Sequence, residues 1–351
     1  MYHFSFKWFV SIVIIFVGFL SLSAGVGLPD KGIRFGDIFL QKDSPITLTQ
    51  EQSLIGSLRA LQVDSQNYFW CLDSKARNIK QYDNNGKFLG AIGKKGQGPG
   101  EFVRPLAFCV DDDNLLVGDP QARKLHVFDK SRKFERFLRI RDCREMHRLD
   151  AHTIILGAAV KDHGKTGSSL HLFDMRKGDV KKSFYPISEN ALKNRMIGDG
   201  IFFDLDKENN IYSIQEMEYQ ISKFNSTGNL LKTFASPNSQ YKAPPSKPFE
   251  DFLQRSKLTA WIKSWTHIHG LFVVGNRIII QMIQFQGEDT YYLLDLYSLD
   301  GTSLYQGIKS KYRLLNSDSN EILYFINENL EAEEQISILK FTIRERKKRD
   351  R

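Results

Sequence analysis

An internal repeat constrains the fold of this chain more than any other feature. Residues 72–83 (LDSKARNIKQYD) align without a gap with residues 118–129 (GDPQARKLHVFD), 46 positions later. The aligned positions include the identical pairs Asp73 with Asp119 and Arg77 with Arg123. Each copy holds two strand-like apolar runs around an Asp-led turn, and a hairpin signal at residues 83–86 (DNNG) leads into a third run. Each unit is therefore expected to form a small antiparallel sheet of four strands.

Fainter copies of this unit follow along the chain. An aromatic residue near the end of the same strand marks six copies: Tyr82, Phe128, Phe173, Phe224, Tyr297 and Phe341. One such sheet cannot cover both of its faces, so neighbouring units have to stack, and radial closure protects the sheet edges. We therefore predict an all-β fold, a six-bladed β-propeller of four-stranded antiparallel blades over residues 33–344. Residues 46–49 or 35–40 should pair with residues 336–343 and close the ring.

The longest interval between two copies contains an insertion at residues 244–270. Apolar residues at spacings of three and four over residues 249–265 predict one or two short helices before the fifth blade. Such a segment either forms a helical lid packed on one rim or acts as a gate for a partner or substrate.

The N-terminus indicates export. Lys7 precedes fourteen largely apolar residues, 9–22, which are followed by small residues around Ala24. This order predicts a signal peptide over residues 1–25. The alternative is an uncleaved membrane anchor, since residues 9–28 are twenty uncharged positions. Both interpretations place the folded part outside the cytoplasm, in the periplasm, in the cell envelope or as a secreted protein.

The C-terminal tail and the cysteines allow two further expectations. The last eight residues carry six basic and two acidic side chains, so residues 345–351 form a basic tail. We expect this tail to be solvated, with contact to anionic lipid or a polyanion as the alternative. Nucleic-acid binding is excluded because no stacking aromatics interrupt the basic run. The three cysteines are expected to be buried and unpaired.

The segment between the first two units resembles a known repeat. Residues 93–102 (GKKGQGPGEF), Pro105, the Asp-rich run at 111–119 and residues 123–129 are similar to an NHL repeat. The whole chain resembles the exported bacterial six-bladed β-propellers related to NHL proteins, which implies the same fold but no particular activity. The glycines at 93, 96, 98 and 100 are expected to allow positive φ where the chain crosses between blades. A phosphate cradle is disfavoured, because no Lys-Ser/Thr pair or helix start follows them.

Candidate ligand-binding residues follow from the repeat. They are Asp73, Arg77, Lys94, Lys95, Asp119 and Arg123. The Asp and Arg residues should lie near one rim, where they either close turns and pair with each other or contact a ligand.

The chemistry expected from the sequence is binding rather than catalysis. Nucleophile-elbow and zinc-protease motifs are absent. Some relatives in the resembled family are lyases or lactonases with a metal ion in the central channel, but His267 and His269 supply two ligands where three or four are needed. We therefore expect a non-catalytic extracytoplasmic binding module without a cofactor, which presents rim loops and a central channel to a protein, peptide or glycan. Membrane contact is expected only with an uncleaved N-terminus. The alternative is a metal-dependent lyase or lactonase.

Overall fold

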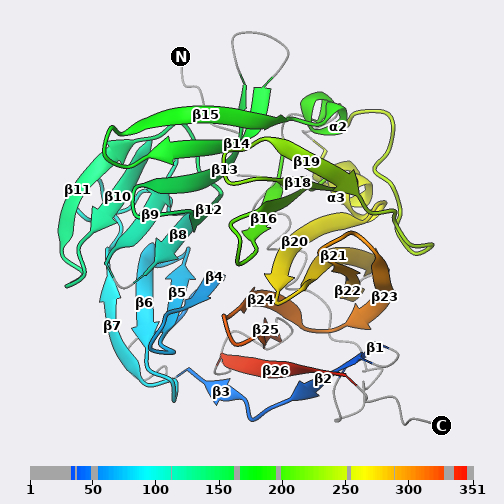
Figure 1. The fold of residues 1–351 in the computed structure, drawn as a ribbon, viewed down its shortest axis with the longest axis horizontal. Coiled ribbons are helices and arrows are strands. Elements are labelled where there is room, and N and C mark those ends of the chain that lie inside the picture. Colours follow the sequence, from blue (N-terminus) through cyan, green and yellow to red (C-terminus); the bar gives the residue numbers. More distant parts are fainter. Residues whose placement is uncertain are drawn as a thin grey trace.

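Six antiparallel sheets follow one another around a ring (Figure 1). The computed structural model describes residues 33–35, 38–48, 54–111, 113–161, 167–194, 199–250, 254–287, 289–327 and 336–345. The predicted signal peptide and most of the basic tail lie outside these residues. Within them, the predicted all-β fold of six blades is confirmed.

The first five blades each use four consecutive strands. Blade 1 holds β4 (Leu58–Val63), β5 (Phe69–Asp73), β6 (Asn78–Tyr82) and β7 (Phe88–Ile92). Blade 2 holds β8 (Ala107–Val110), β9 (Leu115–Asp119), β10 (Lys124–Phe128) and β11 (Phe134–Arg139). Blade 3 holds β12 (Glu145–Arg148), β13 (Thr153–Lys161), β14 (Gly167–Asp174) and β15 (Asp179–Pro186). Blade 4 holds β16 (Ile201–Leu205), β17 (Ile211–Gln215), β18 (Glu218–Phe224) and β19 (Leu230–Phe234). Blade 5 holds β20 (His267–Val274), β21 (Arg277–Gln286), β22 (Asp289–Ser298) and β23 (Ser303–Ser310).

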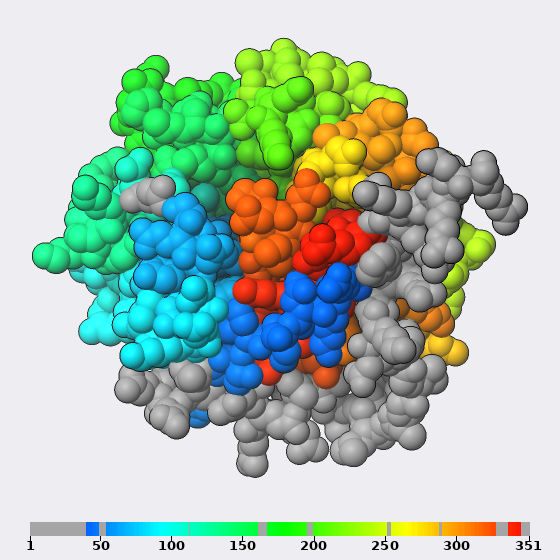
Figure 2. All heavy atoms as spheres, turned by 60° about the horizontal axis from the view of Figure 1, so that its bottom comes forward, coloured from blue at the N-terminus to red at the C-terminus, as the bar shows by residue number. Residues whose placement is uncertain are grey.

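The sixth blade combines the two ends of the chain. Its strands β24 (Arg313–Ser317), β25 (Ile322–Ile326) and β26 (Ser337–Glu345) come from the C-terminal part. Its outer strands are β1 (Ile33–Phe35), β2 (Ile38–Lys42) and β3 (Ile46–Thr47). Strand β2 pairs with one end of β26 and β3 with the other, so both predicted closing segments are used. Figure 2 shows the blue part of β2 and β3 against the red last strand.

The repeated aromatic residue explains why the blades stack. All six are buried in the third strands of their blades, and each belongs to a different apolar cluster between two neighbouring blades. Phe128, for example, packs with Trp70 and Leu72 of the preceding blade. The sequence repeat therefore records one contact that recurs around the ring.

The first strands of the blades surround the ring axis, and each contacts the next. Polar side chains join them across the blade boundaries. Gln62 of β4 donates to the carbonyl of Phe108 and accepts from the amide of Val110. Gln281 of β21, the second strand of blade 5, likewise donates to the carbonyl and accepts from the amide of Leu314 in β24. These contacts satisfy the inner sheet edges that closure leaves facing the axis.

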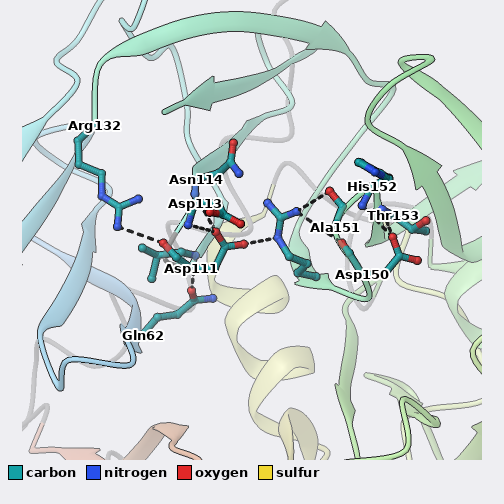
Figure 3. A network of polar contacts seen from close by, with 11 residues as sticks. Gln62, Asp111, Asp113, Asn114, Arg132, Asp150, Ala151, His152 and Thr153 are labelled. Atoms are coloured by element: carbon teal, nitrogen blue, oxygen red, sulfur yellow. Dashed lines mark hydrogen bonds and ion pairs between the residues drawn. The ribbon is translucent and has the colours of Figure 1, made fainter. Parts of the chain in front are cut away.

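Blades 2 and 3 are joined at the turns that follow their first strands. Asp111 closes its own turn by accepting from the amides of Asp113 and Asn114 (Figure 3). It also forms an ion pair with Arg148, while its carbonyl accepts from Arg132. The Asp111 carboxylate therefore closes its own hairpin turn and also links blade 2 to blade 3.

The described residues include two helices, α2 (Glu189–Lys193) and α3 (Arg255–Lys263). Helix α3 lies in the predicted insertion and buries Leu258 and Ile262 in a cluster with Trp265 and residues of blades 4 and 5. The insertion is thus packed on the ring, and its last residues, from His267 on, already belong to β20. No helix in the described ranges is long and apolar enough to cross a membrane. The three cysteines are buried and free, as predicted.

Candidate functional site

One face of the ring gathers most of the candidate residues. Strands alternate in direction, so the second strand of a blade ends at the same face from which the fourth strand passes to the next blade. We call this the connection face. The opposite face carries the turns between first and second strands and between third and fourth strands. Asp73, Asp119, Lys94, Lys95 and both helices belong to the connection face.

Asp73 is committed to its own blade. It is fully buried at the end of β5, and it accepts from the amides of Lys75 and Ala76 in the following turn. Its ion-pair partner at 2.6 Å is the equally buried Lys80 rather than Arg77. Burial opposes ionisation, but Lys80 and the surrounding amides outweigh it and hold the pKa of Asp73 below its ordinary value.

Asp119 repeats the contacts to backbone amides in blade 2 but not, among the described residues, the ion pair with a buried lysine. Its carboxylate accepts from the amides of Arg104 and Ala122, which lie before the first strand and in the turn. Arg77 and Arg123 share a left-handed backbone, with φ of 58° and 56°, and each closes a turn through its own amide. A ligand role for these four residues stays a prediction, because every contact described here is structural.

The glycine-rich crossing differs in part from the prediction. Gly93 and Gly100 have positive φ, of 81° and 71°, whereas Gly96 and Gly98 do not. A Cβ at Gly96 would lie 2.0 Å from Oε2 of Glu101, and the amide of Gly98 donates to the same oxygen. These two glycines therefore make room for a carboxylate rather than for an unusual backbone.

The two predicted lysines lie within this crossing, between Gly93 and Gly96, and are exposed. Nζ of Lys94 lies 3.4 Å from the carboxylate of Glu101, and Lys95 forms an isolated bridge with Phe102. Both side chains can therefore reach solvent on the connection face.

The two histidines proposed as weak metal ligands have other surroundings. His267 is buried, with Nδ1 at 3.1 Å from Glu216 and Nε2 at 2.8 Å from the carbonyl of Ile262. Both ring nitrogens therefore face hydrogen-bond acceptors of the protein. His269 lies at a register shift in β20, near the rings of Phe202 and Tyr292. In the part of the chain that the structure describes, no three His, Cys, Asp or Glu side chains are grouped to hold a metal ion.

Four arginines that the sequence did not single out meet around the axis. Arg59 lies on β4 and Arg313 begins β24, while Arg104 and Arg144 stand shortly before β8 and β12. We call Arg59, Arg104, Arg144 and Arg313 the arginine cluster. They come from four successive blades, and all four are partly exposed.

Backbone carbonyls of neighbouring blades hold two of these guanidiniums. Nε of Arg59 donates to the carbonyl of Leu106 at 2.7 Å. The guanidinium of Arg313 donates to the carbonyl of Leu58 at 2.9 Å. Each bond crosses a blade boundary at the axis, so the ring itself fixes these side chains.

The pKa values of Arg59 and Arg144 are shifted in opposite directions. Burial, together with the charges of Arg144, Arg104 and Arg313, lowers the pKa of Arg59 to about 10. Burial opposes the charge of Arg144 as well, but Asp199, Asp142 and Glu216 outweigh it and raise its pKa. Asp199 lies 3.0 Å and Asp142 3.6 Å from the guanidinium of Arg144. Negative charge therefore gathers on the Arg144 side.

A polar chain links the cluster to helix α3. Arg144 pairs with Asp199, and the next amide, of Gly200, donates to Glu216 at 3.2 Å. Glu216 in turn contacts His267, which reaches the carbonyl of Ile262 in α3. The insertion and the arginine cluster thus share one connected network.

An acidic pair lies beside the cluster. Glu145 accepts from the amide of Phe203, and Asp204 accepts from that of Val273, so each carboxylate holds the next blade. Burial and the charge of Asp204 raise the pKa of Glu145 well above its ordinary value. Burial also raises the pKa of Asp204, and it lowers the pKa of His147, whose Nδ1 lies 3.6 Å away. These groups could not be found from the sequence, because they are single polar residues on short strands and form no motif.

Comparisons with known proteins agree on the fold. The family model described as a domain of unknown function (DUF4934) matches residues 48–213. No curated protein matches the chain in sequence.

Two solved structures from Bacteroides resemble the whole ring. A member of the DUF4221 family from Bacteroides vulgatus has a TM-score of 0.68 at 12% identity, covering 89% of this chain and 100% of that one. A candidate exported protein from Bacteroides fragilis has a TM-score of 0.64 at 15% identity, with coverages of 90% and 97%. The predicted resemblance to exported bacterial six-bladed propellers is therefore confirmed at the level of the fold.

Proposed function

We propose that this protein is a non-catalytic extracytoplasmic binding module. Its connection face and ring axis receive a protein, peptide or glycan ligand. The observation that carries this proposal is the arginine cluster, in which four blades bring partly exposed arginines to one end of the axis. Propellers commonly bind ligands where the loops of a rigid ring converge.

The surroundings of the cluster support a binding role. Backbone bonds across blade boundaries hold Arg59 and Arg313 in place before any ligand arrives. Such preorganisation reduces the entropy that a binding site loses on association. Helix α3 joins the same network through His267, which gives the site a large neighbouring surface. The predicted signal peptide and the exported structural neighbour support an extracytoplasmic location.

The proposal is tested by ligand capture on the mature protein. Purified protein lacking residues 1–25 is probed with arrays of peptides, neutral glycans and acidic glycans. The variant Lys94→Glu/Lys95→Glu and, separately, Arg104→Glu alter the connection face. The variant Lys130→Glu/Lys133→Glu makes the same charge change as the first on exposed residues of the turn between β10 and β11, on the opposite face.

A ligand lost in a connection-face variant and kept in the opposite-face variant supports the proposal. No captured ligand, or capture that neither connection-face variant weakens, contradicts it. Stoichiometric, tightly bound metal in the purified protein would favour the metal-dependent alternative instead.

A further inference from the structure

We propose that the arginine cluster is a binding site for an oxyanion, that is, a carboxylate, sulfate or phosphate group. This inference rests on the proposed function and specifies the chemistry of its ligand. The group would be bound at the connection-face end of the ring axis, between Arg59 and its neighbours.

The hydrogen bonds of Arg59 leave one end of its guanidinium available. Its Nε is committed to the carbonyl of Leu106, which fixes the plane of the group. Among the described residues, no carboxylate forms an ion pair with Arg59. The remaining N–H groups form a planar fork, and such a fork matches two oxygens of a carboxylate, sulfate or phosphate.

The charge balance around the axis favours an added anion. Among the described residues, Asp142, Asp199 and Glu216 act on Arg144, and Asp142 also acts on Arg104. The charge of Glu145 also acts on Arg59, but each of the three neighbouring guanidiniums acts on it more strongly. The Arg59 side therefore carries repulsion between like charges that an anion would relieve.

Burial strengthens the repulsion between these charges. The four arginines are partly exposed, and yet burial is the largest cause that lowers the pKa of both Arg59 and Arg104. Charges in such surroundings are screened less by salt than charges on an open surface. An anion that enters from solvent would therefore be attracted by several guanidiniums at once.

Isothermal titration of the mature protein with named probes tests the inference. Inorganic sulfate, inorganic phosphate and acetate form the free-anion arm. Polygalacturonate, heparin and poly-glutamate form the polymer arm, which separates free anions from anionic groups borne on a glycan or a peptide. Arg59→Gln removes the charge, and Gln62→Ala is the matched control, because Gln62 joins the same two blades from the same strand without a charge.

At least one probe is expected to bind the wild type. Its Kd should rise about ten-fold or more in Arg59→Gln, the loss expected for a charged hydrogen-bonding partner, and should stay within about two-fold in Gln62→Ala. Arg104→Gln replaces Arg59→Gln if circular dichroism shows that the latter does not fold. The Arg104 contact to Asp119 is made by its backbone amide, which the substitution keeps.

Two results overturn the inference. One is the absence of binding by every anionic probe, and the other is binding that survives the loss of the Arg59 or Arg104 charge. Neutral ligands captured on the connection face would then leave the proposed function standing while the oxyanion site fails. Capture of no ligand of any class would reject both.

Discussion

The turns of blades 1 and 2 and the arginine cluster use charged residues in opposite ways. At the turns, Asp73 and Asp119 accept from several amides, and Asp73 also has a buried lysine. At the axis, burial and the like charges of its neighbours lower the pKa of Arg59 to about 10. A carboxylate whose charge is neutralised by hydrogen bonds and a lysine stabilises the ring. A guanidinium surrounded by like charges is suited to bind an incoming anion. The residues that repeat between blades stabilise the ring. The arginines at the axis, which do not repeat, form the candidate binding site.

The largest effect is expected where a buried pair is broken. Asp73→Ala leaves Lys80 buried without its partner and should cost about 3–5 kcal/mol of unfolding free energy. Asp119→Ala removes hydrogen bonds to amides but no buried ion pair, and should cost about 1–3 kcal/mol. Urea denaturation of both variants measures the difference. Equal losses would show that the Lys80 pair adds nothing to the turn.

The next largest loss of stability is expected in the glycine-rich segment that crosses from blade 1 to blade 2. Gly100→Val places a β-branched residue at a φ of 71° and should cost about 1–3 kcal/mol. Gly98→Val is its control, since Gly98 lacks positive φ and its nearest neighbour is the flexible end of Glu101. Thermal melts should show the larger loss for Gly100→Val. The reverse order would contradict the backbone assignment.

The acidic pair beside the cluster predicts a pH dependence. The pKa of Glu145 is higher in the folded chain than its ordinary value of 4.5. Its contribution to stability is thus fully present below that ordinary value and is lost as pH rises through the folded-state pKa. Denaturation from about pH 4 to pH 8 should show a shallower decline for Glu145→Gln than for the wild type. Identical slopes would mean that Glu145 titrates normally.

The smallest effect is expected at the axis. Arg59→Gln loses one hydrogen bond to Leu106 but relieves like-charge repulsion, so its stability should change by about 1 kcal/mol or less. Arg148→Gln removes the ion pair with Asp111 between blades 2 and 3 and should cost more. Chemical denaturation of the two variants compares them. A larger loss for Arg59→Gln would assign the cluster a purely structural role.

The ring could be predicted from the sequence because the same contact recurs in it. Phe128 and its five counterparts fill equivalent positions between blades, so the repeat was visible despite weak identity. The partner of Asp73 could not be predicted, since Lys80 and Arg77 are both near in sequence and only the register of β6 decides between them. The arginine cluster was also missed, because its members precede or begin short first strands that carry no repeated motif. Their proximity exists only once the ring is closed.

Closure of the ring is the claim on which the rest depends, since it places Arg313 of the last blade beside the first strand of blade 1. Closure is made inside blade 6, where Gln41 of the N-terminal strand β2 pairs with Thr342 of the C-terminal strand β26. The double variant Gln41→Cys/Thr342→Cys, examined by mass spectrometry and thermal melting after mild oxidation, tests it directly. We predict one intramolecular disulfide and a higher melting temperature that reduction reverses. Free thiols at both positions, or disulfides only between molecules, would contradict the closed six-bladed ring.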